Sequence, residues 1–220
     1  TLTPTISNTG VTKVYDGTTA AIFTPTYSFV GLVAGDSSAI LTNTGKVYNN
    51  AHVVGANIIT VSGLDIAGIT GTKGSQSTDY VLDGSSKTVA ATITTKTLTP
   101  TITNTLVTKV YDSTKDTSIT PTYSFSGLVD GDGATLTNTS KVYNSADVLS
   151  ATRVTVSGLS IAGITGTNSS AITDYVLDST SKTVSATITA KALTIGSATG
   201  VNKVYDSTRE ATISAIGNLD

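Results

Sequence analysis

The segment Asp130-Gly-Asp-Gly133 places two carboxylates in one glycine-rich turn. Calcium binds several oxygen ligands from flexible acidic loops, so this spacing is similar to a fragment of a calcium loop. Residues 134–138 add no acid, and the matching segment Ala34-Gly-Asp-Ser37 has one carboxylate fewer. The sequence therefore favours an ordinary Gly-Asp turn between strands, and we expect no metal site.

Histidine chemistry depends on one residue, His52, because the chain contains no other imidazole. Its counterpart in the internal duplication described below is Asp147, so a Ser-His-Asp triad or a histidine metal site cannot occur in both copies. We expect His52 to be a surface residue on a loop. A glycosidase-type carboxylate pair has little support, because Glu210 is the only glutamate and no Asp pair marks a cleft. We therefore expect no enzyme, no catalytic residues and no cofactor.

The motif Lys13-Val-Tyr-Asp16 brings a lysine and a carboxylate together, and it recurs at Lys109 and Lys203. One interpretation is an intramolecular Lys–Asn isopeptide bond, which needs a buried lysine, an asparagine and a carboxylic acid kept neutral by burial. The other interpretation, which we favour, is a charged pair that flanks a strand and its turn.

Tyrosines recur at matched positions and raise the question of sugar binding. An exposed row of rings can stack on carbohydrate, whereas a small core can use tyrosine for apolar bulk. We favour the core, because each position lies in an apolar strand context. The matched pairs are Tyr15 and Tyr111, Tyr27 and Tyr123, Tyr48 and Tyr143, and Tyr80 and Tyr175, with Tyr205 continuing the first series.

Composition excludes several classes of protein. The 220 residues include 45 Thr and 26 Ser, only 13% charged residues, and no Cys, Met or Trp. Disulfides and thiolate chemistry are therefore ruled out, and a net charge of −2 with few bases makes a poor nucleic-acid binder. No apolar run approaches the roughly 18 residues of a membrane span, and no signal peptide opens the chain. Because the chain begins with Thr1 and not with Met, we expect a segment of a longer protein.

Two glycosylation sequons, Asn138-Thr-Ser140 and Asn168-Ser-Ser170, occur in the second half of the chain. The first half lacks both. A chain this rich in Thr and Ser produces such matches by chance, so they carry no prediction.

The elements that carry these residues form an internal repeat. Leu2-Thr-Pro-Thr-Ile6 returns 96 residues later at Leu98, and Asp79-Tyr-Val-Leu-Asp83 returns 95 residues later at Asp174. A third copy opens at Leu193. We therefore predict three segments, which are residues 1–96 (repeat 1), residues 97–191 (repeat 2) and residues 192–220, the opening strands of a truncated third repeat.

Short runs with alternating apolar and polar side chains fill each repeat, and Gly, Asn and Asp separate them. Many short strands at this spacing predict an all-β fold of tandem small β-sandwich (Ig-like) domains. A related open barrel stays the alternative. In repeat 1 the predicted strands are 2–7, 11–16, 26–31, 39–42, 46–48, 58–62, 66–69, 80–82 and 88–94.

The strand pattern hardly stops between the two repeats. Val89 and Ile93 share one parity and Leu98 and Ile102 share the other, so the inward face must change at this boundary. The linker at 94–97 contains no glycine, so we expect it to be short and stiff. Domains joined in this way predict an end-to-end rod.

Four motifs of repeat 1 together resemble the YDG domain, which is named for its Tyr-Asp-Gly opening. They are Lys13-Val-Tyr-Asp-Gly-Thr-Thr-Ala20, Gly31-Leu-Val-Ala-Gly-Asp36, Thr60-Val-Ser-Gly-Leu64 and Asp79-Tyr-Val-Leu82. The chain departs from the family pattern where Ser113 and Ser207 replace Gly17. YDG domains occur in tandem in large exported bacterial surface proteins, including adhesins of the filamentous-haemagglutinin type. The resemblance implies a stalk or fibre repeat at the cell surface and implies no catalytic residues.

We therefore expect a structural stalk or fibre repeat of a bacterial cell-surface or secreted adhesin, located outside the cell. The expected partners are neighbouring repeats of the same chain and identical chains in a fibre, with no nucleic acid and no membrane span. A repeated carbohydrate- or protein-binding module that uses surface tyrosines is the alternative. Buried tyrosine rings would count against it.

Overall fold

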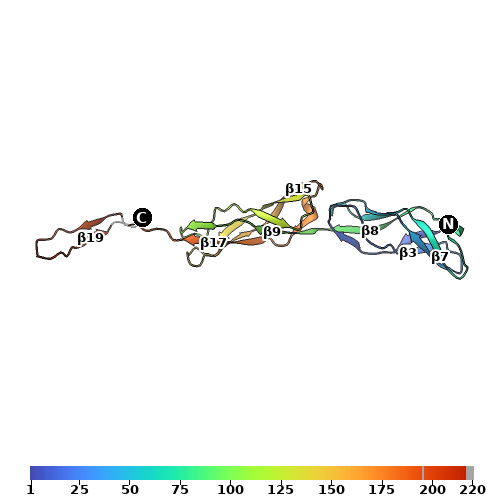
Figure 1. The fold of residues 1–220 in the computed structure, drawn as a ribbon, viewed down its shortest axis with the longest axis horizontal. Coiled ribbons are helices and arrows are strands. Elements are labelled where there is room, and N and C mark those ends of the chain that lie inside the picture. Colours follow the sequence, from blue (N-terminus) through green and yellow to red (C-terminus); the bar gives the residue numbers. More distant parts are fainter. Residues whose placement is uncertain (195, 217–220) are drawn as a thin grey trace. The chain divides into compact units, whose positions relative to one another are not determined.

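The computed structural model describes residues 1–194 and 196–216, and its fold is all-β, as the sequence predicts (Figure 1). The strands of repeat 1 are β1 (Thr3–Ile6), β2 (Val11–Val14), β3 (Tyr27–Val30), β4 (Asp36–Thr42), β5 (Gly45–Tyr48), β6 (Ile58–Ser62), β7 (Asp65–Gly71) and β8 (Ser86–Thr94). Those of repeat 2 are β9 (Lys96–Ile102), β10 (Val107–Val110), β11 (Tyr123–Ser126), β12 (Asp132–Thr137), β13 (Ser140–Tyr143), β14 (Arg153–Ser157), β15 (Ser160–Gly166), β16 (Tyr175–Leu177) and β17 (Ser181–Thr189).

A few smaller elements complete the structure. Each repeat has a single-turn 3-10 helix, η1 (Ser77–Asp79) in repeat 1 and η2 (Ile172–Asp174) in repeat 2. The third copy contributes β18 (Ala198–Gly200) and β19 (Ile213–Ile216), which pair antiparallel. In the part of the chain that the structure describes, no helix has the length and apolar character needed to cross a bilayer.

The strands form because alternate side chains can be buried. In β8, Val89, Ala91 and Ile93 are at most 8% exposed, while most of the residues around them face solvent. Thr and Ser occupy many of the outward positions. The β-branched Thr side chain favours an extended backbone, and its hydroxyl group stays hydrated. In β17 the same alternation buries Ala186 and Ile188.

Repeat 1 contains three small sheets. β2, β8, β6 and β5 form a four-stranded sheet in that order, with β2 parallel and β6 antiparallel to β8. β4 pairs antiparallel with β7, and β1 pairs antiparallel with β3. Repeat 2 contains the matching sheets β10-β17-β14-β13 and β12-β15, and its third sheet has the order β11-β9-β16.

The strand predicted at 80–82 forms in only one repeat, so this prediction is wrong for repeat 1. There the segment makes a single bridge, between Leu2 and Leu82. In repeat 2 its counterpart β16 pairs parallel with residues Lys96 to Leu98 of β9. The ladder of repeat 2 joins Tyr175 to Lys96, Val176 to Thr97 and Leu177 to Leu98.

The inward face changes at the repeat boundary, as the parity of the apolar residues predicts. β8 ends at Thr94 and β9 begins at Lys96, so only Thr95 separates them. Ile93 is 3% exposed and Leu98 is fully buried, although they lie an odd number of positions apart. The chain therefore reverses its buried face within two or three residues.

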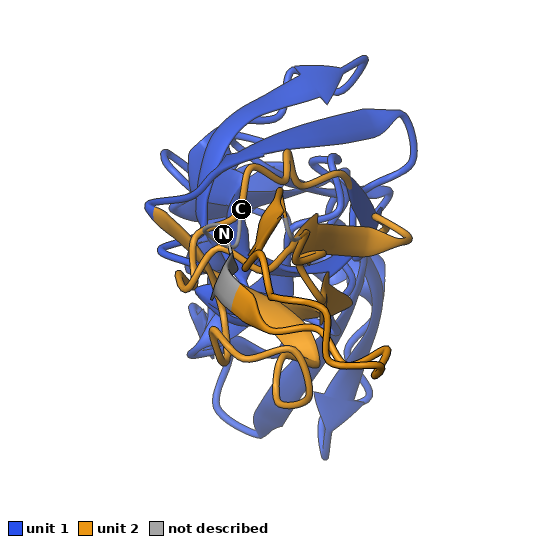
Figure 2. Cartoon of the chain, turned by 90° about the vertical axis from the view of Figure 1, so that its left-hand side faces the viewer, with its two compact units in different colours: residues 1–102, 123–139, 157–182 blue, residues 103–122, 140–156, 183–220 orange. Residues whose placement is uncertain are grey.

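Backbone contacts divide the chain into two compact units that do not follow the repeats (Figure 2). Unit 1 comprises residues 1–102, 123–139 and 157–182, and unit 2 comprises residues 103–122, 140–156 and 183–220. In unit 1 a single hydrophobic cluster includes Ile59 and Val61 of repeat 1 together with Leu98 and Tyr175 of repeat 2. Repeat 1 thus shares its core with the part of repeat 2 that lies in the same unit. We call this contact the joint.

Candidate functional site

The lysine of the K-V-Y-D motif closes the turn after β2. Lys13 Nζ donates to Asp16 Oδ1 at 2.6 Å and to the carbonyl oxygens of Thr18 and Ala20 at 2.7 and 3.0 Å. The pair recurs as Lys109–Asp112 at 2.6 Å and Lys203–Asp206 at 2.7 Å. The charged-pair interpretation is confirmed. Because the amino group contacts carboxylate, carbonyl and hydroxyl oxygens, its geometry gives no support to an isopeptide bond with asparagine.

The carboxylate of this motif is held in its ionised form. The hydrogen bond from Lys109 and a second bond from the backbone N–H of Thr114 lower the pKa of Asp112 to about 2. A group with such a low pKa stays ionised near neutral pH, where a general acid or base would need to exchange protons. The pair is therefore suited to fixing a turn.

Several of the recurring tyrosines belong to the core. The exposed fraction is 0% for Tyr15, 3% for Tyr48, 1% for Tyr143 and 4% for Tyr175, whereas it is 38% for Tyr111 and 88% for Tyr205. A buried ring cannot stack on a sugar. For the four buried positions the core interpretation is confirmed, and their rings are not available to a surface binding row.

The acidic turns hold the tyrosines of the D-Y-V-L motif. Tyr80 donates its hydroxyl hydrogen to Asp36 Oδ2 at 2.6 Å, and Tyr175 donates to Asp132 Oδ2 at the same distance. Each hydroxyl also accepts a backbone N–H at 3.0 Å. Burial and the bond to Asp132 raise the pKa of Tyr175 to about 12. The Gly-Asp turn and the D-Y-V-L motif thus form one structural unit in each repeat.

The turn that is similar to a calcium loop contains Asp132, whose carboxylate is hydrogen-bonded to other groups of the protein. Asp132 Oδ1 accepts the side-chain N–H of Asn168 at 3.0 Å, and Oδ2 accepts Ser170 at 2.5 Å in addition to Tyr175. The expected Gly-Asp turn is therefore present, with Asp132 used to close it. Among residues 1–194 and 196–216, no group of three or more His, Cys, Asp or Glu side chains is placed to hold a metal ion. Asn168, which begins a sequon, directs its side-chain amide into this turn.

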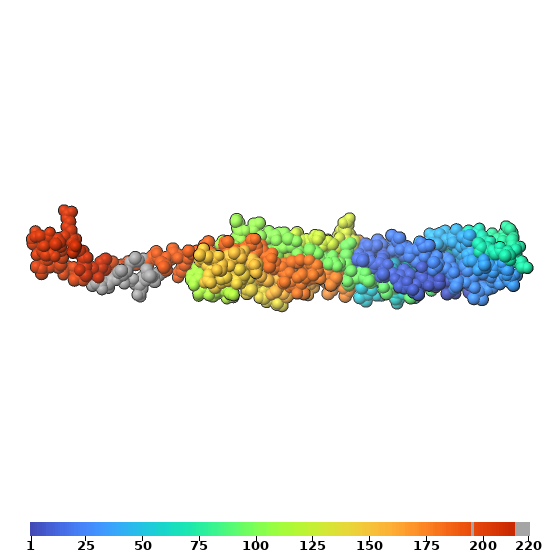
Figure 3. All heavy atoms as spheres, turned by 90° about the horizontal axis from the view of Figure 1, so that it is seen from below, coloured from blue at the N-terminus to red at the C-terminus, as the bar shows by residue number. Residues whose placement is uncertain are grey.

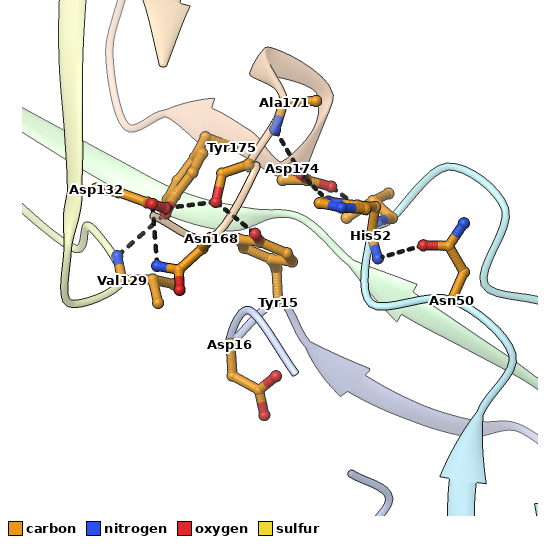
Figure 4. A network of polar contacts seen from close by, with 12 residues as sticks. Tyr15, Asp16, Asn50, His52, Val129, Asp132, Asn168, Ala171, Asp174 and Tyr175 are labelled. Carbon is orange, nitrogen blue, oxygen red and sulfur yellow. Dashed lines mark hydrogen bonds and ion pairs between the residues drawn. The ribbon is translucent and has the colours of Figure 1, made fainter. Parts of the chain in front are cut away.

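A polar network crosses the joint (Figure 4). Asp174 is completely buried and accepts three hydrogen bonds of 2.8 Å, from Nδ1 of His52 and from the backbone N–H groups of Val53 and Ala171. Because carboxylate oxygens accept, Nδ1 of His52 carries the shared proton. The side chain of Asn50 accepts the backbone N–H of His52 at 2.9 Å and fixes the loop. A loop of repeat 1 is thereby fastened to an acidic residue of repeat 2.

Tyr15 contributes the second half of the network. Its ring stacks on His52 with centroids 6.0 Å apart and meets Tyr175 edge-on at 5.5 Å. Its hydroxyl lies 2.5 Å from Ser170 Oγ, and Ser170 donates its own hydrogen to Asp132. Tyr15 is therefore the donor in a relay that ends on the Asp132 carboxylate. Figure 3 shows atoms of repeat 1, in blue, beside green atoms of repeat 2.

The expectation that His52 is a surface residue is wrong, although His52 does lie on a loop. Its side chain is only 28% exposed and bonds across the joint. Asn49 shapes this loop, because its side chain donates to the Gly55 carbonyl and accepts the N–H groups of Asn57 and Ile58. The one available signal in the sequence is the exchange of His52 for Asp147 between repeats. This exchange does not show which residue either side chain contacts.

Each repeat also has a shallow groove at the same place. In repeat 1 it has a volume of about 430 Å³ and is lined by residues 64–66, 77–78, 80–82 and 84–85. In repeat 2 it has a volume of about 390 Å³ and is lined by the matching residues around Leu159 and Val176. Leu, Ile, Ser and Thr make up much of both linings. They provide apolar contact and hydroxyl groups but no charged site shared by both repeats.

Comparison with known protein families finds the YDG domain twice, at residues 1–90 and at residues 94–183. The two matches are consecutive and cover most of the chain. Searches of curated proteins and of solved structures found no match. The chain therefore belongs to the YDG domain family.

Proposed function

We propose that this chain is a stalk or fibre segment of a bacterial cell-surface or secreted adhesin. In this proposal Ig-like β-sandwich repeats follow one another end to end as a rod outside the cell, and none is an enzyme. The supporting observation is the joint, where one hydrophobic cluster continues from repeat 1 into the adjoining part of repeat 2. Repeats that share a core keep a defined orientation to their neighbours, as the units of repeat proteins do. A stalk needs this property.

The chemistry of the conspicuous residues supports the same proposal. Lys13, Asp132 and Asp174 each have their polar atoms occupied by neighbouring protein groups. A site that acts on a substrate usually keeps such groups available to it. Thr- and Ser-rich strands present an uncharged hydrated surface, and the absence of Cys and Met leaves no sulfur to oxidise.

The alternative proposal, a carbohydrate- or protein-binding module with surface tyrosines, has weaker support. Tyr15, Tyr48, Tyr143 and Tyr175 are buried and cannot contribute. Tyr111 is still partly exposed, but its counterpart Tyr15 is completely covered at the joint. We therefore assign these four buried tyrosines to packing.

Small-angle X-ray scattering of the full chain tests the stalk proposal. We expect a maximum dimension at least as large as two repeats placed end to end, unchanged by a chelator. A compact particle, or one whose dimension changes with chelator, would contradict the proposal.

Antibodies against the chain, applied to intact cells of the source organism, test its location. Labelling only after the cells are permeabilised would contradict an extracellular stalk.

A further inference from the structure

We propose that the end of repeat 1 away from the joint is a docking surface for another YDG repeat. This surface, which we call the acceptor end, is made by Asp36, Asp79 and Tyr80. Its partner is the donor end of a repeat, which carries Tyr15 and His52 in repeat 1. The inference concerns how YDG repeats recognise one another, and it holds wherever the protein acts.

The acceptor end of repeat 1 has the geometry that receives His52 in repeat 2. Asp79 accepts the backbone N–H of Gln76 at 2.8 Å, as Asp174 accepts that of Ala171 at 2.8 Å. The tyrosine–aspartate bond measures 2.6 Å in both repeats, and the backbone N–H that bonds to the tyrosine lies at 3.0 Å in both. Repeat 1 therefore repeats these local hydrogen bonds of the surface that receives His52 at the joint.

The two copies differ in how far they are covered and satisfied. Asp174 is completely buried, whereas Asp79 is exposed. Asp36 Oδ1 has no hydrogen-bond partner among the described residues, whereas the same oxygen of Asp132 accepts Asn168 of its own repeat, where repeat 1 has Lys73. The acceptor that a neighbour can reach is therefore the exposed Asp79 carboxylate, because the equivalent Asp174 accepts two of its hydrogen bonds from the neighbouring repeat.

Charge decides which donor end fits. The donor end of repeat 1 offers the imidazole N–H of His52 and the backbone N–H of Val53 to a carboxylate. The donor end of repeat 2 has Asp147 at the position of His52, so its carboxylate would face Asp79. Two close carboxylates repel each other. Both donor ends carry a tyrosine, Tyr15 or Tyr111. They differ in charge at the loop residue and at Lys115 and Asp116, two opposite charges that replace Thr19 and Ala20. We infer that the acceptor end of repeat 1 selects a histidine-bearing neighbour.

Two fusions of the full chain test this inference. In the histidine fusion, residues 1–96 are placed ahead of Thr1, and the junction Lys96-Thr1-Leu2 reproduces the natural Lys96-Thr97-Leu98. In the aspartate fusion, residues 97–191 are placed ahead of Thr1, which gives Lys191-Thr1-Leu2. The two added segments belong to the same family and use equivalent junctions.

Hydrogen exchange of the backbone amides at 76–80 gives the readout. We expect exchange in the histidine fusion to be slower than in the unfused chain by about tenfold or more, because a docked neighbour covers these amides. We expect little change in the aspartate fusion. Only the original 220 residues carry an isotope label, introduced by segmental ligation, because the histidine fusion contains residues 76–80 twice and the aspartate fusion contains residues 171–175 twice. The labelled amides at 171–175 lie at the existing joint and serve as an internal reference whose rate should be the same in all proteins.

A rescue variant makes the test independent of folding failures. Asp147→His in the added segment of the aspartate fusion supplies the missing donor and should slow exchange at 76–80 towards the rate of the histidine fusion. Unchanged exchange in the histidine fusion would overturn the docking surface. Equal protection by both fusions would overturn the selectivity. Neither result depends on the scattering experiment, so the docking surface and the stalk can fail separately.

Discussion

At Asp174, three N–H groups converge on one completely buried carboxylate. Burying a carboxylate costs free energy unless hydrogen bonds replace the lost water. Two of the three donors, from His52 and Val53, belong to the preceding repeat. Asp174 therefore has all three of these hydrogen bonds only when the two repeats are in contact.

Asp174→Ala should destabilise unit 1 by about 2–4 kcal/mol, because it leaves the donors of His52 and Val53 without a partner. Urea unfolding followed by tyrosine fluorescence measures the change. The matched control is Asp79→Ala, at the exposed equivalent position, which should cost about 1 kcal/mol or less. Equal losses in the two variants would show that the joint contributes nothing beyond the local turn.

Tyr175 should ionise only at high pH, because burial and its hydrogen bond to Asp132 raise its pKa from 10.0 to about 12. A pKa raised in the folded state stabilises the fold fully below pH 10, and this stabilisation is lost as the pH rises through about 12. Phenolate absorbance after a rapid pH jump measures the ionisation before unfolding. Tyr175→Phe should remove the step near pH 12, whereas Tyr205→Phe should not. A step that persists without Tyr175 would contradict the assignment.

At the scale of elements, the turns set where strands meet. Gly127 follows β11 with φ of +91°, and a Cβ there would lie against the carbonyl oxygen of Thr97, well inside contact distance. Gly31 stands in the same relation to Thr1 in repeat 1. Only glycine combines this backbone conformation with so close an approach of another chain segment. These two glycines therefore let the chain pass close to the backbone at the start of the first strand of each repeat.

Gly127→Ala should therefore cost about 3 kcal/mol or more, because the methyl group meets backbone and the φ angle is unfavourable. Gly84→Ala is the control, since a Cβ there has no neighbour within 4 Å and φ is not positive. That variant should stay within about 0.5 kcal/mol of the parent chain. Thermal unfolding by circular dichroism compares the two. A small effect of Gly127→Ala would mean that β9 can shift to make room.

Local patterns explain why most strands could be predicted from the sequence. The strand predicted at 58–62 is β6, and the change of buried face between Ile93 and Leu98 is present, because alternation of side chains is a property of neighbouring residues. The strand predicted at 80–82 has only the bridge between Leu2 and Leu82 in repeat 1, whereas its counterpart β16 pairs with β9 in repeat 2, because a strand needs a distant partner as well as a local pattern.

The joint could not be predicted in the same way. His52 and Asp174 lie 122 positions apart, so no window of local sequence contains both. Their bond requires a loop shaped by Asn49 and a carboxylate positioned by η2 in the next repeat. The sequence shows that both residues exist, but only the packed structure shows that they meet.

At the scale of the whole molecule, the boundary between the sequence repeats is not the boundary between the compact units. Repeat 1 ends at residue 96, whereas unit 1 includes residues 123–139 and 157–182 of repeat 2. Leu98 and Tyr175 of repeat 2 belong to the same hydrophobic cluster as the core of repeat 1. Stability should therefore be shared across the boundary between repeats.

Leu98→Ala tests this sharing, because Leu98 is fully buried in the common cluster. We expect a loss of about 3 kcal/mol from the cavity and the lost burial. Hydrogen exchange should accelerate in β8 of repeat 1 as well as in β16 of repeat 2. The control is Leu193→Ala at the matching position of the third copy, where the side chain is 68% exposed, and its effect should be within about 0.5 kcal/mol. Faster exchange confined to repeat 2 would contradict a shared core.

The distance between His52 and Asp174 has a consequence for the gene. The two residues form one bond but are encoded more than a repeat length apart. An unequal crossover that adds or removes one repeat between their codons gives each residue a new neighbour. Where the incoming loop carries Asp147 in place of His52, the new junction sets carboxylate against carboxylate. Under the selectivity proposed for the acceptor end, an array of such repeats changes its length only at junctions whose two sides match, and unmatched junctions restrict where recombination leaves a folded product.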